Sequence, residues 1–267
     1  MQIAKELRSR RLDEAVAERE CVTRSHARSL IMEGRVSVQG AVATKAGQSV
    51  ARDARIEIER PRRFVSRGGE KLDHALSAFG VDVGGANALD VGASTGGFTD
   101  CLLQRGAARV TALDVGYGQL DWRLRNDPRV RAIERTNFRL LADDAFPDGF
   151  DLITVDASFI SLRTILERGG KYLRAGGAIV ALVKPQFEAG RRRLGSGGVV
   201  RRRETHRAVL QELREAALRL GLVPVALTAS PLRGPAGNRE FFVELRGAGT
   251  PFPDARIEEV LDESHAS

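Results

Sequence analysis

Cysteine and long apolar runs are scarce in this chain of 267 residues, and their scarcity excludes several classes of protein. Cys21 and Cys101 stand far apart without a CxxC or Cys/His spacing, so neither a disulfide framework nor a metal site is expected. The longest apolar run, at residues 178–183, is far shorter than the roughly 18 residues that a membrane-spanning helix needs. The N-terminus lacks the apolar core of a secretory signal. We therefore expect a cytoplasmic protein without a membrane partner.

Acidic residues are also in deficit, which gives a formal net charge of +7 and a pI near 10.1. Residues 1–70 hold 15 Lys and Arg against 10 Asp and Glu, whereas residues 71–267 hold 27 against 25. An excess of positive charge favours a polyanionic partner such as nucleic acid, although some basic proteins are simply soluble. The N-terminal part is the better candidate for such a contact.

The length predicts one large and one small domain, because a typical domain has roughly 150 residues. Residues 61–69 combine a proline, basic residues and a glycine pair, a composition typical of a junction. We therefore place a first domain at residues 1–60, a linker at residues 61–67 and a second domain at residues 68–267.

The first domain has the pattern of a small α+β fold. Apolar residues occur at helical spacing over residues 7–19, and residues 23–34 predict a second helix with a threonine N-cap and a glycine stop. Residues 35–38 and 56–59 alternate in polarity, which predicts short strands.

Two stretches of this domain, RLDEAV at residues 11–16 and TRSHARSLIMEGRVSVQG at residues 23–40, resemble the S4 RNA-binding domain. The resemblance covers about residues 7–60 and implies RNA as a partner. Arginine suits bidentate contact with phosphate, but glutamates in the same helices could instead pair with the arginines internally. The best candidates for RNA contact are Arg11, Arg24 and Lys45.

The second domain alternates strand-like and helix-like stretches, as a doubly wound parallel α/β sheet does. Helical patterns occur at residues 96–106, 161–170 and 202–221 and in the C-terminal tail. Seven strands are predicted, near residues 88–91, 109–115, 130–134, 151–156, 178–184, 224–228 and 241–245.

A glycine-rich loop, DVGASTGGFTD at residues 90–100, follows the first strand of this domain, which ends near Asp90. Its glycines let the backbone turn tightly beside a ligand; they are Gly92, Gly96 and Gly97. Nicotinamide-binding loops read GxGxxG and pack against a pyrophosphate, whereas Ser94 fills the second glycine position here. That difference favours S-adenosylmethionine, which has no phosphate.

The next predicted strand ends at Asp114, 22 residues beyond Gly92. An acidic side chain at this place can accept hydrogen bonds from a ribose diol. The loop could be a simple turn, but its coupling to the acidic strand end predicts an S-adenosylmethionine site. Seven strands also match the usual Rossmann-like methyltransferase sheet. A nicotinamide oxidoreductase is the less favoured alternative.

Four further polar residues lie at strand ends or at the start of the second domain: Lys71, Asp156, Lys184 and Glu240. Two lysines and two carboxylates balance in charge, so they could share one partly buried pocket. A neutral lysine could take the proton of a ribose 2′-hydroxyl while a second cation stabilises the alkoxide. Singly, each residue could instead cap a helix or form an ordinary surface pair.

The whole second domain resembles the FtsJ-like ribose 2′-O-methyltransferases, whose Lys-Asp-Lys-Glu tetrad these four residues match in order. The motifs VSRGGEKL, GASTGGFT, DVGYGQL and VKPQFE, together with the S4-like segment, narrow the resemblance to the TlyA family. It implies methylation of cytidine in ribosomal RNA of the small (16S) subunit, the large (23S) subunit or both. S-adenosylmethionine would be the cofactor, and ribosomal RNA or ribosomal subunits the partner.

The same resemblance implies further site residues. Those for the cofactor are Asp90, Gly92, Ser94, Gly96, Gly97, Phe98, Asp114, Val115 and Asn137, although Phe98 could belong to the core. Those at the mouth of the active site, for the RNA backbone, are Arg67, Arg135 and Arg139. Arg135 could instead pair with Glu134 or Asp144.

Two other functions compete with this interpretation. The family also carries the label hemolysin, but the chain has no spanning segment, and its basic helices are better explained by RNA binding. A catalytically silent RNA-binding factor would retain the fold, but the intact tetrad speaks against it. The target cytidine, the form of the RNA substrate and the oligomeric state stay open.

Overall fold

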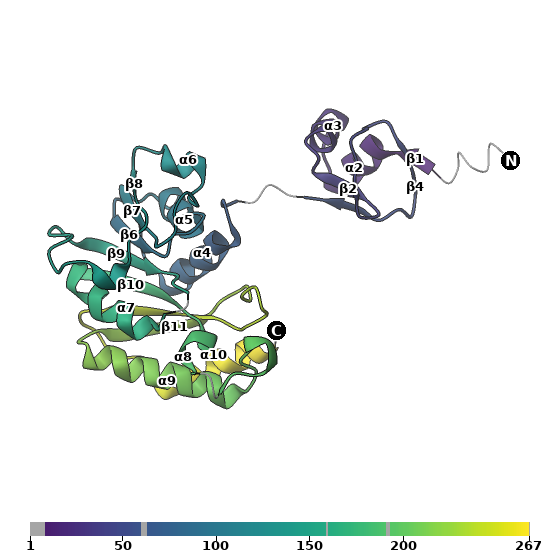
Figure 1. The fold of residues 1–267 in the computed structure, drawn as a ribbon. Coiled ribbons are helices and arrows are strands. Elements are labelled where there is room, and N and C mark those ends of the chain that lie inside the picture. The colour runs from purple at the N-terminus through teal and green to yellow at the C-terminus, as the bar shows by residue number, and fades with distance from the viewer. Residues whose placement is uncertain (1–8, 60–62, 159, 191–192, 267) are drawn as a thin grey trace. The chain divides into compact units, whose positions relative to one another are not determined.

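The computed structural model describes residues 9–59, 63–158, 160–190 and 193–266. The chain divides into two compact units, residues 1–62 and 63–267 (Figure 1). Within the described ranges, no helix is long and apolar enough to cross a membrane.

The first unit combines two helices with short antiparallel strands. Its elements are β1 (Ser9–Arg11), α2 (Leu12–Glu20), α3 (Arg24–Met32), β2 (Val36–Val38), β3 (Ala41–Val42), β4 (Ser49–Ala51) and β5 (Ile56–Ile58). Strand β1 pairs with β4, and β2 lies between β3 and β5. Fully buried Leu12, Val16 and Ile31 lie in the core between the helices and the strands.

The predicted second helix is confirmed, and its start has a local cause: the Thr23 hydroxyl accepts a hydrogen bond from the backbone N–H of His26 at 3.2 Å. The predicted start of the first helix is wrong. Ser9 faces Ala51 in an antiparallel ladder, so the helix begins only at Leu12. Pairing with a distant strand overrides the local helical pattern there.

The second unit is built on a seven-stranded sheet, as predicted from the sequence. Its strands are β6 (Asn87–Val91), β7 (Arg109–Leu113), β8 (Val130–Ile133), β9 (Phe150–Val155), β10 (Leu173–Val183), β11 (Val223–Ala229) and β12 (Phe241–Arg246). Their order is β11-β12-β10-β9-β6-β7-β8. Neighbouring strands from β8 to β10 are parallel, and β12 is antiparallel to both β10 and β11. Because the chain runs from β6 to β7 on one side and later to β9 on the other, the carboxyl ends of these strands form a switch point where ligands bind.

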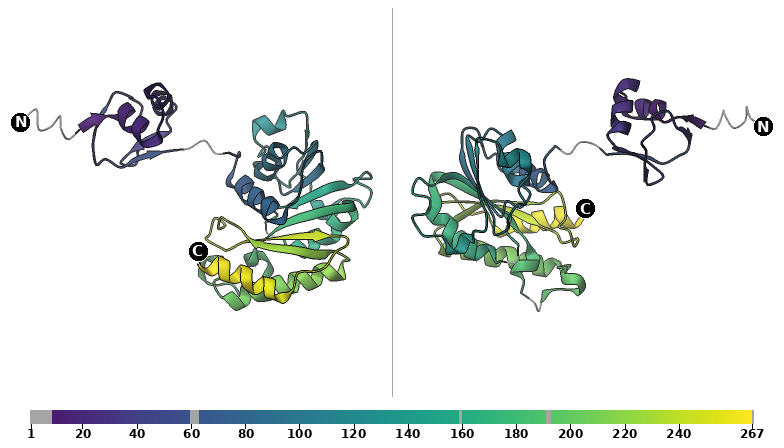
Figure 2. Two further views of the ribbon diagram at one scale, coloured as in Figure 1. Left: turned by 180° about the vertical axis from the view of Figure 1, so that it is seen from behind. Right: turned by 45° about the horizontal axis from the view of Figure 1, so that its top comes forward.

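Helices cover both faces of this sheet (Figure 2). They are α4 (Arg67–Phe79), α5 (Gly97–Gln104), α6 (Trp122–Arg125), α7 (Leu162–Gly169), α8 (Pro185–Glu188), α9 (Arg203–Arg219) and α10 (Asp254–Ala266), with 3-10 turns η1 (Phe138–Leu140), η2 (Gly170–Tyr172) and η4 (Ser196–Gly198). Helices α4 and α5 lie side by side and share one core cluster, whereas α7, α9 and α10 contribute to the other. The sheet therefore has apolar side chains on both faces, as doubly wound sheets do.

Part of the predicted linker packs against the second unit. Phe64 is 2% exposed and belongs to the core beneath α4, where its ring takes the space that a side chain at Gly69 would need. The backbone N–H of Val65 donates to a carboxylate oxygen of Asp100 on α5 at 2.8 Å. Residues 61 and 62 lie outside the described residues.

Candidate functional site

A cavity of about 500 Å³ lies at the carboxyl ends of β6, β7 and β9. This volume is in the range of small-molecule sites. Its lining includes several residues that the sequence singled out: Gly92, Ser94, Asp114, Val115, Asn137, Arg139 and Asp156. The strand order thus brings together residues that are up to 64 positions apart, from Gly92 to Asp156.

Asp114 is held firmly at the end of β7. Its Oδ2 accepts a hydrogen bond from the Ser94 backbone N–H at 2.8 Å, and its Oδ1 accepts one from the Gly116 N–H at 2.7 Å. A carboxylate oxygen has two acceptor positions, so each oxygen can accept another donor. The side chain is therefore fixed in orientation and remains able to bind a diol.

Gly92 packs against the backbone that follows β9. Its φ is +86°, and a Cβ there would lie 2.6 Å from the backbone oxygen of Asp156. Only glycine combines this conformation with this contact. The close approach brings the loop and the end of β9 to the same cavity.

The cavity lining does not include Asp90, whose side chain is fully buried. Its carboxylate accepts hydrogen bonds from the hydroxyls of Thr99 at 2.7 Å and Thr154 at 3.3 Å. Burial, which disfavours the charged form, raises the pKa of Asp90 to about 7. Asp90 thus joins β6 to α5 and β9 behind the loop.

Gly96, Gly97 and Phe98, where the glycine-rich loop passes into α5, are not among the residues that line the cavity either. Phe98 is 3% exposed, and its ring centroid is 6.1 Å from that of Phe242 in the core. At Gly97 a Cβ would lie 2.9 Å from the backbone nitrogen of Gly69, so glycine permits α5 to pack closely on α4. Gly97 and Phe98 thus pack the end of the loop against α4 and the core.

The tetrad residues gather at one edge of the sheet. Asp156 follows β9, Lys184 follows β10, and Glu240 precedes β12. Because Val183 pairs with Phe241 in the antiparallel ladder, the next step of the register puts Lys184 opposite Glu240. Strand topology alone therefore brings three of the four residues together.

These residues form two ion pairs. Lys184 Nζ lies 2.6 Å from Asp156 Oδ1 and donates to the Ser158 hydroxyl at 2.8 Å. Lys71, which reaches the sheet edge from α4, donates from Nζ to Glu240 Oε2 at 2.5 Å.

The Lys71–Glu240 pair is almost inaccessible to water, with the residues 7% and 3% exposed. Removing two charges from water is unfavourable, and a buried ion pair adds little stability compared with apolar residues of the same size. Stability alone therefore does not account for two charged residues at this position.

Three neighbours of the tetrad escaped the sequence analysis. Ser158 bonds to Lys184, and Gly234 packs against Glu240 Oε1 so tightly that a side chain there would overlap it. The side-chain oxygen of buried Asn238 accepts a hydrogen bond from the Val200 N–H at 2.9 Å, which connects the loop before β12 to the loop before α9. Ser158 is close to a predicted residue in sequence, but no local signal marks the other two.

The three arginines predicted near the mouth of the active site are all exposed. Arg139 lines the cavity, and Arg67 is the first residue of α4. Arg135 has a positive φ of 52°, and its guanidinium carbon lies 4.0 Å from the centre of the Tyr117 ring. The alternative partner Glu134 forms an ion pair with Arg125. Arg135 thus stacks on an aromatic ring.

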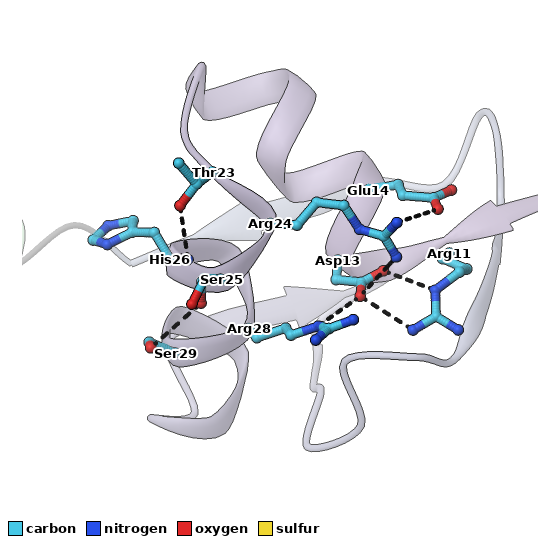
Figure 3. Close-up of polar contacts among 9 residues, drawn as sticks. All are labelled: Arg11, Asp13, Glu14, Thr23, Arg24, Ser25, His26, Arg28 and Ser29. Atoms are coloured by element: carbon cyan, nitrogen blue, oxygen red, sulfur yellow. Dashed lines mark hydrogen bonds and ion pairs between the residues drawn. The ribbon is translucent and has the colours of Figure 1, made fainter.

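In the first unit, Arg11 and Arg24 share one partner. Both form ion pairs with Asp13, and Arg24 also pairs with Glu14 at 3.2 Å (Figure 3). Internal pairing, the alternative raised from the sequence, is therefore present, yet about half of each arginine side chain is exposed. Lys45 precedes Ala46, whose carbonyl accepts the Asp13 backbone N–H at 3.0 Å, so its segment lies beside this cluster.

A seven-stranded sheet of this order, with a glycine loop and an acidic strand end at the switch point, is the architecture of Rossmann-like methyltransferases. Residues 64–247 match the FtsJ-like methyltransferase family, and residues 10–56 match the S4 domain. The chain is 46% identical over 226 residues, 84% of each chain, to the 16S/23S rRNA (cytidine-2′-O)-methyltransferase TlyA of Mycobacterium tuberculosis. The chain therefore belongs to the FtsJ-like methyltransferases and, within them, to the TlyA family.

Other relatives carry a different name. Hemolysin A of Brachyspira hyodysenteriae is 40% identical over 237 residues, which are 88% of this chain and 99% of that protein. A solved structure from Streptococcus thermophilus that bears the hemolysin label is 39% identical, with a TM-score of 0.74 over 97% of this chain and 96% of that one.

In the part of the chain that the structure describes, no group of three His, Cys, Asp or Glu could hold a metal ion.

Proposed function

We propose that this protein transfers the methyl group of S-adenosylmethionine to the ribose 2′-oxygen of a cytidine in 16S or 23S ribosomal RNA, or in both. The observation that carries the proposal is the pair of lysine–carboxylate ion pairs at the sheet edge beside the Asp114 cavity. The FtsJ-like and S4 matches and the name of the mycobacterial relative support the same substrate. Ribosomal RNA or ribosomal subunits are then the partner, and the location is cytoplasmic.

The residues of the cavity fit S-adenosylmethionine. Asp114 keeps acceptor positions for the ribose diol of the cofactor, and Gly92 leaves room where a side chain would collide with β9. Val115 and Asn137 at the same cavity are suited to its adenine end. Four residues of the loop segment pack against the protein interior and so support the cavity indirectly: Asp90, Gly96, Gly97 and Phe98. When bound, the cofactor supplies a methyl group on a sulfonium, which is an electrophile.

Lys184 is suited to be the base, because its partner Asp156 lines the cofactor cavity. Nζ first releases one proton to water and then takes the 2′-hydroxyl proton, while Asp156 and Ser158 hold the amine in place. The 2′-oxygen forms its bond to the methyl carbon as the carbon–sulfur bond breaks and its electrons go to sulfur. Methylated RNA and S-adenosylhomocysteine result.

Lys71 supplies the second cation. Fixed by Glu240 in a nearly dry environment, it can stabilise negative charge that develops on the 2′-oxygen. Gly234 behind Glu240 limits the movement of this pair. Such fixed groups contribute by orienting both reactants as well as by charge.

RNA contacts come from both units in this proposal. The first unit, which matches the S4 domain, is called the S4 unit from this point, and the second unit is called the methyltransferase unit. In the S4 unit we assign the RNA contacts to Arg11, Arg24 and Lys45. In the methyltransferase unit we assign them to Arg67, Arg135 and Arg139, which are exposed.

The test is transfer of labelled methyl groups to separated small and large ribosomal subunits and to their naked RNAs. We expect label on ribose 2′-oxygen and a kcat reduced about 10²-fold or more in Lys184→Ala, the size of effect typical for loss of a general base. Lys171→Ala is the matched control: Lys171 also forms an ion pair, with Asp143 at 2.7 Å, but Asp143 does not line the cavity, whereas Asp156, the partner of Lys184, does. Cofactor binding without transfer to any of these RNAs would support a silent RNA-binding factor instead.

A further inference from the structure

One buried carboxylate in the S4 unit holds three arginines (Figure 3). The Asp13 side chain is 0% exposed, and it accepts from Arg11 Nε at 3.0 Å, Arg24 Nη2 at 3.3 Å and Arg28 Nε at 3.1 Å. Arg11 binds it through two nitrogens, one to each carboxylate oxygen. These hydrogen bonds, that from Arg11 above all, hold the pKa of Asp13 well below its usual range. The three arginines therefore favour the ionised form of Asp13.

The three arginines are not core residues, because their side chains are 47%, 49% and 53% exposed. Arg24 and Arg28 lie on the first turns of α3, where no acidic residue is present. Cations at the N-terminus of a helix are unfavourable for the helix dipole. A sequence selected for the stability of α3 alone would carry acidic residues there.

The cluster keeps an excess of positive charge. Three guanidinium groups meet two carboxylates, those of Asp13 and Glu14. A guanidinium has five N–H donors in a rigid plane, more than the contacts with Asp13 use. The arrangement is therefore suited to accept a further anion.

Backbone hydrogen bonds connect the loop at residues 46–48 to the start of α2, beside this cluster. Leu12 and Asp13 donate their backbone N–H groups to the carbonyls of Gln48 and Ala46 at 2.9 and 3.0 Å. Gly47 between them lies against Arg11, and a Cβ there would be 3.0 Å from Arg11 Nη2. The loop limits where the Arg11 guanidinium can go.

We propose that Asp13 is a positioning residue that holds Arg11, Arg24 and Arg28 together as one binding cluster for the phosphate backbone of ribosomal RNA. Arginine pairs with phosphate through two parallel hydrogen bonds, which requires that its plane be oriented. Asp13 supplies that orientation from the protein side while the exposed side of the cluster meets phosphate. The inference rests on the proposed function and extends it by naming Arg28 and the carboxylate that orients all three arginines.

Asp13→Asn gives a test in which charge and geometry predict opposite results. The substitution raises the net charge by one, so simple electrostatic attraction predicts tighter RNA binding. Loss of orientation predicts weaker binding, by about ten- to hundredfold, because charged hydrogen bonds to phosphate no longer form. Binding of the full chain to 16S and 23S ribosomal RNA would be titrated over a range of salt concentrations. The logarithmic salt slope should become shallower by about 0.7–0.9 for each phosphate group that the variant no longer binds.

A second substitution keeps the test valid if Asp13→Asn fails to fold. Arg28→Lys retains the charge and removes the planar fork, and we expect about tenfold weaker binding with an unchanged fold. Arg55→Lys is the matched control, because Arg55 is an 80% exposed arginine elsewhere in the same unit, paired with Glu57. It should bind as the wild type does.

The outcomes distinguish failure of the arginine-cluster inference from failure of the proposed function. If the wild type binds and methylates ribosomal RNA but folded Asp13→Asn and Arg28→Lys bind it as tightly, the cluster is structural and the inference is wrong. If the wild type neither binds nor methylates these RNAs, the proposed function itself fails. A variant that acts only through RNA contact should raise KM for RNA and leave kcat nearly unchanged.

Discussion

Lys71 and Glu240 carry opposite charges in a place where charge is unfavourable. Their ion pair is 2.5 Å long, and the side chains are 9% and 1% exposed. Removing one member of such a pair leaves an uncompensated buried charge, whereas replacing both by apolar residues is often neutral. This asymmetry permits the stabilising and chemical roles of the pair to be measured separately.

Glu240→Gln should lower the free energy of unfolding by about 3–5 kcal/mol, because it leaves Lys71 buried without its counter-charge. Combining Lys71→Met with Glu240→Leu should recover most of that loss. Both variants should lose methyl transfer, because the cation at the sheet edge is removed or misplaced. Urea unfolding and transfer of labelled methyl groups measure the two effects. A stable double variant with wild-type activity would show that the pair has no part in the reaction.

At the scale of elements, the fold was largely predictable and its exceptions have physical causes. The seven strands follow from apolar runs bounded by turns. Strand β10 begins at Leu173, earlier than predicted. The Gly176–Gly177 pair resembles a turn in the sequence, but in the structure the strand continues through it, with an irregular register between Leu173 and Ala178. Helix α4 was not predicted, since Gly68 and Gly69 occupy its first turn and hide its periodicity.

Asp90 connects three of these elements, and its ionisation should couple their packing to pH. Its folded pKa of about 7 is raised from an ordinary value near 3.8, with burial as the main cause and the charge of Asp156 as a smaller one. The folded state therefore prefers the neutral carboxyl. The stability that this group contributes is complete below about pH 4 and is lost as the pH rises through 7.

Asp90→Asn keeps a neutral side chain at every pH, so it isolates this effect. The free energy of unfolding of the wild type, minus that of Asp90→Asn, should fall by about 2–3 kcal/mol between pH 5 and pH 8, at roughly 1.4 kcal/mol per pH unit of difference in proton binding. Chemical denaturation across this range provides the measurement. A constant difference would mean that Asp90 is already ionised in the folded protein at pH 5.

At the scale of the whole molecule, the sequence predicted which residues meet but not how they pair. Asp156 and Lys184 lie at one sheet edge because the parallel strands β9 and β10 end there, and Glu240 joins them because the antiparallel strand β12 begins there. That Lys184 pairs with Asp156, and Lys71 with Glu240, depends on the path of α4 and on the register of β12. Such long-range geometry leaves no periodic trace in a sequence. Asp13 was overlooked for the same reason, since its three partners meet only in the folded S4 unit.

The two units have separate hydrophobic cores, and this separation predicts how the protein responds to truncation. The core residues of the first unit lie within residues 12–58, and those of the second unit begin at Phe64. Every assigned cofactor and tetrad residue is in the second unit, so a chain of residues 63–267 should fold and bind S-adenosylmethionine as the full chain does.

RNA should respond differently, because residues 1–62 hold 13 Lys and Arg against 9 Asp and Glu, a net charge of +4 out of +7 for the whole chain. Without the S4 unit and its arginine cluster, the shortened chain should have a much higher KM for ribosomal RNA and a shallower salt dependence of binding. Its kcat at saturating RNA should change little, because the tetrad is intact. Calorimetry with S-adenosylmethionine and methyl-transfer kinetics at several salt concentrations test both halves of the prediction. An unchanged KM for RNA would show that the methyltransferase unit alone supplies the RNA affinity, whereas weaker cofactor binding by the folded fragment would show that the cofactor site needs the first unit.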